Sequence, residues 1–480
     1  MTSARSARGG VLGLATVVVE RGLSLAGIVA LGRILVPADF GRWAFVVSWL
    51  AAFQVLADPG LEAVLVRRLA APGADRARLL ASGLSLRALL AVASTALAVA
   101  LAPLAVDAGS ASATRLLVGC GAAAMLLQAQ PVYRSLLRAE LRMGAVFGVA
   151  AASSLAAFVA TVAAAASGLG VPAVFLAVAA AQAMGFAAAR LVAHRGVGGA
   201  RRVDPSLWRG LLREAWPIGA NVLVVTLGLR MGALVLMRAR GPGEVGFYSS
   251  ATRLTESLNL VADGAMLTVF PALARRAFED PAGLIAIARP TARLLAIAIL
   301  APDLLAGLFR PEFAAAAPAL VVASWSALLA ALGTLYGGLL VATGRQRVLL
   351  WINTAATVLL LGLQWLVVPR AGMVGAASVS LVTSVASHVV LALLPATRDL
   401  VGPCLRAAMA PVACAALLLA CERFAPGPPL ARAALLTVSF PVLLGISGAL
   451  GRREFGALGE ALAGDSRTQA DEGERRGGKL

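Results

Sequence analysis

Several long apolar stretches of this 480-residue sequence contain amide and ionisable side chains at helical spacing. Gln54, Asp58 and Glu62 recur every fourth residue, so an α-helix would place them in one stripe on one face. A second set spans an arc of about 120° on another predicted helix and consists of Arg253, Glu256, Asn259 and Asp263. Because an ionisable group in lipid costs at least about 2.5–3.5 kcal/mol, such stripes indicate a hydrated cavity between helices.

The residue types in these stripes indicate two kinds of chemistry. Arginine carries a permanent charge and binds phosphate groups through two parallel hydrogen bonds. We therefore expect a substrate cavity formed by Arg21, Arg230, Arg253, Gln54 and Asn259. A carboxylate inside a membrane can carry a proton or a cation, so the expected ion-coupling residues are Glu20, Asp58, Glu62, Glu256 and Asp263. In the plainer interpretation, neighbours such as Glu20 and Arg21 only neutralise each other between packed helices.

The sequence contains no pattern typical of a metal site or of catalysis. None of its four cysteines forms a Cys-x-x-Cys pair, and its two histidines, His194 and His388, lie far apart. It also lacks a phosphate-binding loop of the Gly-x-x-x-x-Gly-Lys-Ser/Thr type, which disfavours an ATP-driven pump. We therefore expect no enzymatic activity, no metal and no bound cofactor, with a proton or sodium gradient as the source of energy.

The composition indicates that the elements carrying these residues cross a membrane. Hydrophobic residues make up 60% of the chain and charged residues 14%, whereas soluble proteins have roughly 45–50% and 25%. A spanning helix needs about 20 apolar residues, and the sequence has about fourteen such stretches. They are residues 11–32, 43–65, 84–106, 115–133, 144–167, 171–192, 215–237, 247–272, 286–309, 316–341, 348–368, 373–394, 404–421 and 432–450. The predicted fold class is an all-α polytopic membrane protein.

The basic residues are distributed unevenly between the predicted loops. The chain has 42 lysine and arginine residues against 24 acidic ones, a net charge of +18. Most of them become cytosolic if both termini lie in the cytosol, as in segments 67–78, 134–142 and 190–213. Those inside predicted helices are Arg21, Arg87, Arg230 and Arg253. The basic excess therefore indicates an N-in, C-in topology, and no nucleic-acid partner is expected.

Two parts of the chain align without gaps at an offset of 205 residues. The matched pairs are Arg33 and Arg238, Pro37 and Pro242, Gly41 and Gly246, Gln54 and Asn259, and Asp58 and Asp263. Because six predicted helices separate the partners, the repeats have the same orientation and predict two six-helix lobes. We expect an N-terminal lobe at 1–200, a C-terminal lobe at 201–395, two extra helices at 396–451 and a disordered cytosolic tail at 452–480. A transporter of this kind holds its substrate between the lobes and exposes it to each side in turn.

Residues 32–68 carry the motif Arg-Ile-Leu-Val-Pro-Ala-Asp-Phe-Gly, followed farther along by Asp-Pro-Gly. With this motif the chain resembles the bacterial polysaccharide and O-antigen-type oligosaccharide flippases of the multidrug/oligosaccharidyl-lipid/polysaccharide exporter superfamily. The matching positions are Arg33, Pro37, Asp39, Phe40, Gly41, Asp58 and Gly60. Segments 229–254, 308–320 and 369–377 extend the resemblance. The chain departs from the family at Gly232, two positions after Arg230, where many members have an acidic residue.

The resemblance implies translocation of an undecaprenyl-diphosphate-linked oligosaccharide from the cytosolic to the outer leaflet of the plasma or inner membrane. The implied process is biosynthesis of lipopolysaccharide or another cell-surface polysaccharide. The implied partners are the lipid bilayer, the lipid-linked oligosaccharide, and a polysaccharide polymerase or glycosyltransferases.

Four alternatives remain open at this point. A multidrug or toxin extruder of the same superfamily would carry cations, which the intramembrane arginines would repel. A flippase for a lipid-linked peptidoglycan precursor differs only in cargo. A membrane-embedded glycan polymerase or ligase would need a large outward loop, and the predicted outward loops are all short. A non-transporting scaffold would leave the polar stripes unexplained.

Overall fold

The computed structural model describes residues 2–106, 111–128, 130–194, 203–256 and 307–422, with a few single positions between 257 and 306. Within these ranges the regular elements are all helical, and nine helical segments are long and apolar enough to cross a membrane. Large apolar side chains such as Trp216, Trp351 and Trp365 are exposed on them, at 57%, 75% and 53%. Such exposure suits lipid, so the chain is a multi-pass membrane protein. The total of fourteen spans and the N-in, C-in topology stay predictions.

The chain divides into two compact units, the first of which comprises Met1–Ser250, Leu308–Glu312 and Leu361–Ala376. Its helices are α1 (Thr2–Ile34), α2 (Pro37–Ala57), α3 (Leu61–Leu69), α4 (Arg76–Leu101), η1 (Ala102–Ala105), α5 (Ala111–Leu127), α6 (Gln130–Ala139), α7 (Met143–Ala166), α8 (Val171–His194), α9 (Ser206–Arg240) and the start of α10 (Pro242–Glu256). The first seven predicted spans all fall on these helices. The predicted lobe boundaries stay predictions.

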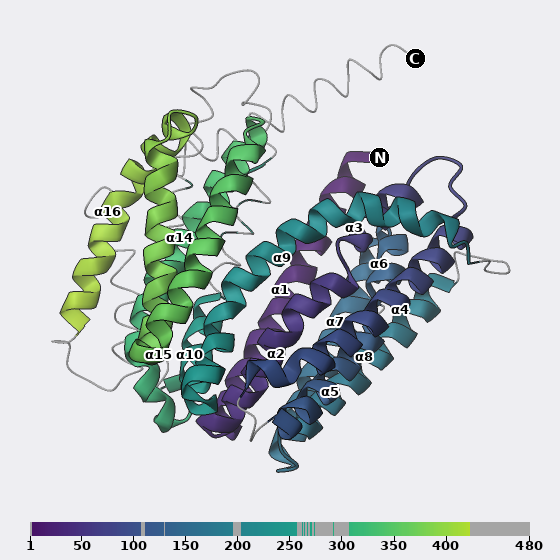
Figure 1. Ribbon diagram of the computed structural model, residues 1–480. Coiled ribbons are helices and arrows are strands. Elements are labelled where there is room, and N and C mark those ends of the chain that lie inside the picture. Colours follow the sequence, from purple (N-terminus) through teal and green to yellow (C-terminus); the bar gives the residue numbers. More distant parts are fainter. Residues whose placement is uncertain are drawn as a thin grey trace. The chain divides into compact units, whose positions relative to one another are not determined.

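Within the first unit, α1 packs on α7, α7 on α8 and α8 on α5, while α9 lies against α2, α3 and α4 (Figure 1). Leu65, Leu69, Tyr133 and Leu136 are buried in a core formed mainly by α3 and α6, to which α4, α7, α8 and α9 also contribute. The side chain of Asp75 accepts a 3.0 Å hydrogen bond from the Arg78 backbone N–H and so caps the start of α4. The packing of α2, α3, α4, α6 and α9 against one another places these five helices around the cavity described below.

The predicted internal repeat has a structural counterpart at two helix starts. Pro37 begins α2 and Pro242 begins α10, as expected of a residue that fits the first helical position. A Cβ atom added to Gly41 would lie 1.8 Å from the Pro242 carbonyl oxygen, and one added to Gly246 would lie 2.0 Å from the Pro37 carbonyl oxygen. The two helix starts therefore meet through two reciprocal glycine contacts, and the offset of 205 residues makes these two contacts equivalent to each other.

The second unit comprises Ala251–Gly307, Phe313–Leu360 and Ala377–Leu480. Its helices are most of η3 (Pro311–Ala316), α14 (Ala317–Ala342), the two ends of α15 (Gln346–Leu393) and α16 (Arg398–Glu422). The sequence predicts separate helices at 348–368 and 373–394, and α15 consists of two helices that meet at a break at Gly372. At Gly372 the backbone leaves the helical region, with a φ of 58° that glycine adopts readily. Buried side chains such as Leu335, Tyr336 and Val401 form the core of the second unit.

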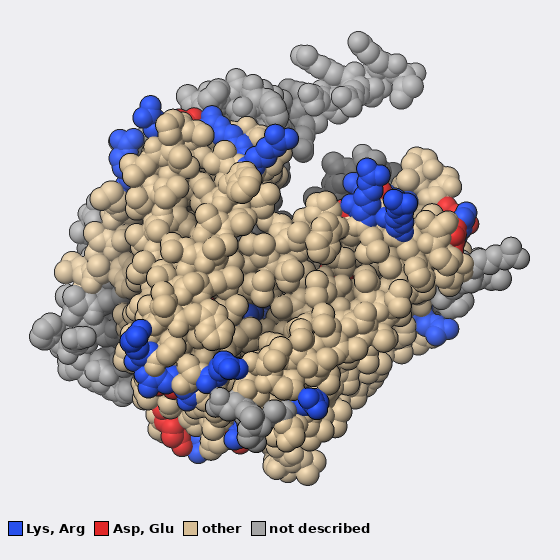
Figure 2. Space-filling view, in the orientation of Figure 1, with Lys and Arg blue, Asp and Glu red and all other residues tan. Residues whose placement is uncertain are grey.

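Several predicted segments lie outside the described residues. They are the span at 432–450, the tail at 452–480, part of the span at 247–272 and most of the span at 286–309. The predicted span at 404–421 falls within α16. On the face shown in Figure 2, the described surface of each unit is largely uncharged, and basic side chains gather near the helix ends. This is the distribution expected of helices whose middle parts contact lipid.

Candidate functional site

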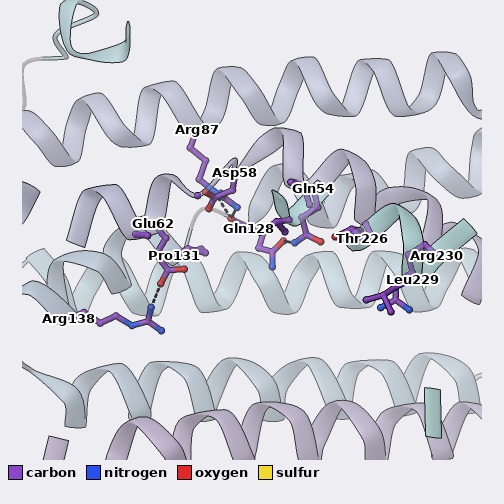
Figure 3. Close-up of a pocket in the computed structure, with 15 residues that line it drawn as sticks. Gln54, Asp58, Glu62, Arg87, Gln128, Pro131, Arg138, Thr226, Leu229 and Arg230 are labelled. Carbon is purple, nitrogen blue, oxygen red and sulfur yellow. Dashed lines mark hydrogen bonds and ion pairs between the residues drawn. The ribbon is translucent and has the colours of Figure 1, made fainter. Parts of the chain in front are cut away.

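A cavity of about 560 Å³ lies within the first unit (Figure 3). Its lining comes from α2, α3, α4, α6 and α9 and from the connections between α2 and α3 and between α5 and α6. The polar lining residues are Gln54, Asp58, Glu62, Arg87, Gln128, Arg138, Thr226 and Arg230. The cavity therefore contains the whole first polar stripe predicted from the sequence, together with the predicted arginine of α9.

The predicted stripe does not lie on one continuous helix. We expected a single helix over 43–65, but α2 ends at Ala57 and α3 begins at Leu61. Pro59 has no N–H to donate, and Gly60 has a φ of +96°, a conformation that side chains rarely allow. Asp58 then accepts a 2.8 Å hydrogen bond from the Leu61 backbone N–H, which starts α3. The break turns Asp58 and Glu62 toward different partners.

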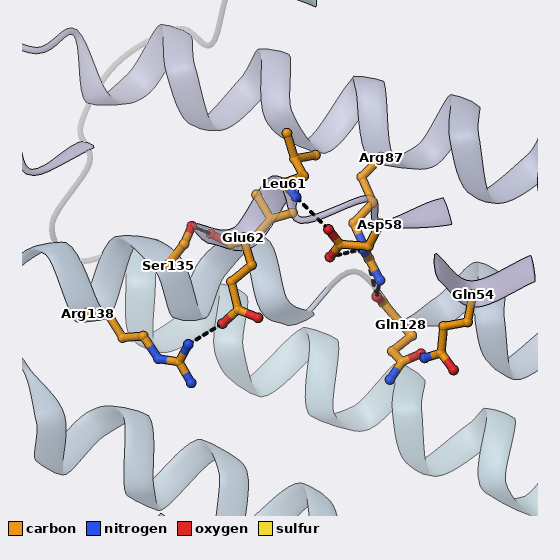
Figure 4. Close-up of polar contacts among 9 residues, drawn as sticks. Gln54, Asp58, Leu61, Glu62, Arg87, Gln128, Ser135 and Arg138 are labelled. Atoms are coloured by element: carbon orange, nitrogen blue, oxygen red, sulfur yellow. Dashed lines mark hydrogen bonds and ion pairs between the residues drawn. The ribbon is translucent and has the colours of Figure 1, made fainter. Parts of the chain in front are cut away.

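A second helix break lies at the same cavity. α5 ends at Leu127 and α6 begins at Gln130, so Gln128 lies between the two helices with its carbonyl group outside both. The side-chain amide of Gln54 on α2 donates to the side-chain oxygen of Gln128 (Figure 4). The two interrupted segments, α2–α3 and α5–α6, are therefore linked directly at their breaks.

Arg87 on α4 reaches both breaks. Its Nη1 donates to Oδ2 of Asp58, while Nε and Nη2 donate to the Gln128 carbonyl oxygen at 3.0 and 2.7 Å. Its side chain is only 4% exposed, and that of Asp58 is 17% exposed. A buried charge is tolerated only with such partners. Arg87 thus satisfies a carboxylate and an unpaired main-chain carbonyl at the same time (Figure 4).

The other predicted coupling carboxylates in the described chain also have arginine partners. Glu62 binds Arg138 at 2.6 Å, and Glu20 on α1 binds Arg134 at 2.9 Å. Arg134 and Arg138 are one turn apart on α6, so this short helix presents both cations on the face opposite its apolar core. The plainer interpretation paired Glu20 with its neighbour Arg21. In the structure Glu20 pairs with Arg134 on α6 instead, and Arg21 is exposed on α1.

The second predicted stripe is only partly within the described residues. Arg253 and Glu256, on the part of α10 that belongs to the second unit, form an ion pair at 3.5 Å. Asn259 and Asp263 lie outside the described residues. Of the ten predicted site residues, the structure places Gln54, Asp58, Glu62 and Arg230 at the cavity of the first unit.

Sequence reasoning missed Arg87, Gln128, Arg134 and Arg138. The sequence predicts a span that ends at residue 133 and a cytosolic loop at 134–142, whereas α6 continues to Ala139. The amphipathic spacing of α6 could have corrected this assignment, because the buried residues Tyr133, Leu136 and Leu137 alternate with the two arginines at helical period. Arg87 was noted as an intramembrane arginine, but nothing local in the sequence gives its partners.

The fold and the cavity define a class of protein: helical membrane proteins built like solved flippases and multidrug transporters. A structure of the lipid II flippase MurJ aligns with a TM-score of 0.68 at 10% identity, covering 90% of this chain and 98% of that one. The MATE multidrug transporter DinF-BH aligns with a TM-score of 0.57 at 14% identity, covering 81% and 94%. A Vibrio cholerae MATE transporter, VcmN, aligns with a TM-score of 0.51 at 16% identity, covering 80% and 95%.

A family model described as polysaccharide biosynthesis protein matches residues 6–276, more than half of the chain. The chain belongs to this family. No curated protein matches it by sequence. The predicted family is thereby confirmed, and the fold of its solved structural neighbours agrees with the predicted superfamily.

Proposed function

We propose that this protein flips an undecaprenyl-diphosphate-linked oligosaccharide from the cytosolic to the outer leaflet by alternating access, for cell-surface polysaccharide biosynthesis. The cavity of the first unit carries the proposal. Its ionisable lining residues are three arginines, Arg87, Arg138 and Arg230, and two carboxylates, Asp58 and Glu62. With three arginines against two carboxylates, the lining residues carry one more positive than negative charge. Such a lining favours a diphosphate and disfavours a cationic drug.

The size and shape of the cargo are consistent with this site. A cavity of about 560 Å³ accommodates a diphosphate with its first sugars, while an apolar polyprenyl chain would stay in the lipid beside the helices. The large exposed apolar side chains of the first unit, including Trp216 on α9, provide such a lipid-facing surface. The proposed location is the plasma or inner membrane, and the proposed partners are a polysaccharide polymerase or glycosyltransferases.

For ion coupling we propose Glu62 in preference to the other described carboxylates. Its side chain lines the cavity and is 30% exposed, and its partner Arg138 is 35% exposed, so water and ions reach this pair. A proton or sodium ion that binds Glu62 would release Arg138 for the cargo. Replacement of Glu62 by glutamine should therefore abolish the dependence of transport on the ion gradient.

A second candidate cargo is a lipid-linked peptidoglycan precursor, because the structural alignment with the lipid II flippase MurJ covers 98% of that protein and 90% of this chain. Such a lipid also carries a diphosphate, so the cavity alone does not separate the two cargoes. Deletion of the gene separates them. Our proposal predicts accumulation of the lipid-linked oligosaccharide on the cytosolic face, with normal peptidoglycan. Accumulation of the peptidoglycan precursor would favour the second cargo, and increased drug sensitivity without lipid accumulation would contradict both.

A further inference from the structure

The two helix breaks at the cavity together form an electronegative site. α2 and α5 end there while α3 and α6 begin there, so the partial charges of the helix ends oppose each other, and the negative charge at the site comes from the Asp58 carboxylate beside the Gln128 carbonyl oxygen. The Asp58 carboxylate and the Gln128 carbonyl oxygen face the same point from the two breaks. In membrane transporters, interrupted helices with this arrangement coordinate cations. A carboxylate beside a free main-chain carbonyl is a suitable donor set for a monovalent cation.

In this chain an arginine from a third helix occupies that position. The Arg87 guanidinium makes one contact with Asp58 and two with the Gln128 carbonyl oxygen, at 3.0 and 2.7 Å for the latter. The remaining carboxylate oxygen of Asp58 accepts from the Leu61 backbone N–H. The side-chain amides of Gln54 and Gln128 bind each other beside it. The carboxylate oxygens of Asp58 and the carbonyl oxygen of Gln128 therefore all accept hydrogen bonds from groups of the chain itself.

We propose that Arg87 is a built-in cation that fills an ion site between the two helix breaks and holds them in register. Asp58 is then a positioning residue, permanently neutralised, and is not available to couple transport to an ion gradient. The link to transport rests on the proposed function, but the site and its occupant do not. The Arg87 side chain is only 4% exposed, which supports its permanent presence in the site. If the guanidinium moved away, the carboxylate of Asp58 would stay buried without a partner, which is costly.

The proposal predicts chemical rescue. The variant Arg87→Ala removes the cation and leaves a space shaped for a planar guanidinium beside Asp58 and Gln128. We expect the purified full-length variant to lose about 5 °C or more in Tm. Millimolar guanidinium ion should restore most of that loss, whereas urea, which has the same planar shape without the charge, should not. In the double variant Asp58→Asn with Arg87→Ala, guanidinium should no longer raise the Tm.

Arg209→Ala is the matched control, because Arg209 is an exposed arginine on α9 outside the cavity. Its Tm should be unchanged and insensitive to guanidinium. If Arg87→Ala cannot be purified, Arg87→Lys and Arg87→Gln decide the question: the charged variant should keep the higher Tm. Failure of guanidinium to raise the Tm of Arg87→Ala, or equal losses in the lysine and glutamine variants, would overturn the proposal.

Transport assays distinguish this inference from the proposed function. If guanidinium restores the Tm of Arg87→Ala and also its flipping of the lipid-linked oligosaccharide, both stand. If it restores the Tm while the wild-type protein flips no such lipid, the built-in cation stands and the proposed cargo is wrong. If Asp58 instead proves to bind the coupling ion, Asp58→Asn will flip lipid without dependence on the gradient, and the inference fails.

Discussion

Gly41 lies so close to Pro242 that any side chain at position 41 would collide with the Pro242 carbonyl oxygen, 1.8 Å from an added Cβ atom. The equivalent residues, Gly246 and Pro37, make the same contact in the opposite direction at 2.0 Å. The obstacle in both cases is main chain, which cannot rotate away as the end of a flexible side chain would. The first turns of α2 and α10 are thus held together by backbone contact.

We expect Gly41→Ala and Gly246→Ala each to destabilise the protein by at least about 1–3 kcal/mol, the usual cost of an overpacked core. Gly148→Ala on α7 is the control, because a Cβ atom there would meet nothing within 4 Å; it should be neutral or slightly stabilising. Thermal unfolding of the purified variants measures the difference. Equal Tm values for Gly41→Ala and Gly148→Ala would show that the close contact at Gly41 does not limit which residue the position tolerates.

The ion pair of Glu62 and Arg138 at 2.6 Å should behave as a coupled unit. Either single replacement, Glu62→Gln or Arg138→Gln, leaves a partly buried charge without its partner, so each should lower the free energy of unfolding. The double variant should lose less than the sum of the two, with an interaction energy of about 0.5–3 kcal/mol in a double-mutant cycle. Strict additivity would mean that the two side chains do not interact in the folded protein.

Asp204, in the connection before α9, gives a pH dependence that lies outside the spans. Hydrogen bonds from Ser206 and from Arg78 lower the pKa of its carboxyl group to about 2 from 3.8. Because the folded state holds the proton less tightly than the unfolded chain, the stabilisation is present above pH 3.8 and is lost as the pH falls toward 2.

The Tm difference between wild type and Asp204→Asn should therefore be constant from neutral pH down to about pH 5 and shrink below that. The ion pair of Asp204 with Arg78 lies at the surface, with the Arg78 side chain 51% exposed, so the difference should also decrease at high salt. Thermal unfolding over a pH series checks both expectations. A difference that grows on acidification would show that the folded state does not lower the pKa of this carboxyl group.

The sequence predicts the positions of the main elements well, because apolar length and proline placement are local properties. The first seven predicted spans fall on helices, although α2 and α10 begin at Pro37 and Pro242, several residues before the predicted starts at 43 and 247. Gln54, Asp58, Glu62 and Arg230 reach one cavity. The break at Asp58 could not be predicted with the same ease. Asp-Pro-Gly interrupts helical hydrogen bonding, but the apolar pattern continues across it and reads as one span.

The ion pairs were beyond sequence reasoning for a different reason. Arg87 lies 29 residues from Asp58 and 41 from Gln128, and only the packing of α4 against both breaks brings them together. Arg134 is 114 residues from Glu20. A carboxylate in an apolar segment indicates that a partner is needed, but it does not indicate which of several arginines fills the role.

The central claim is that a cationic cavity moves a lipid-linked diphosphate, and Arg230 tests it most directly because it lines the cavity from α9. The measurement is flipping of an undecaprenyl-diphosphate-linked oligosaccharide in vesicles containing the purified protein, with Arg209→Ala on the same helix as the control. We expect wild type and Arg209→Ala to flip the lipid at equal rates, Arg230→Ala to be at least about tenfold slower, equivalent to about 1.4 kcal/mol, and Arg230→Lys to fall between them. Flipping by the wild type no faster than in protein-free vesicles, or an unchanged rate in Arg230→Ala, would contradict the account.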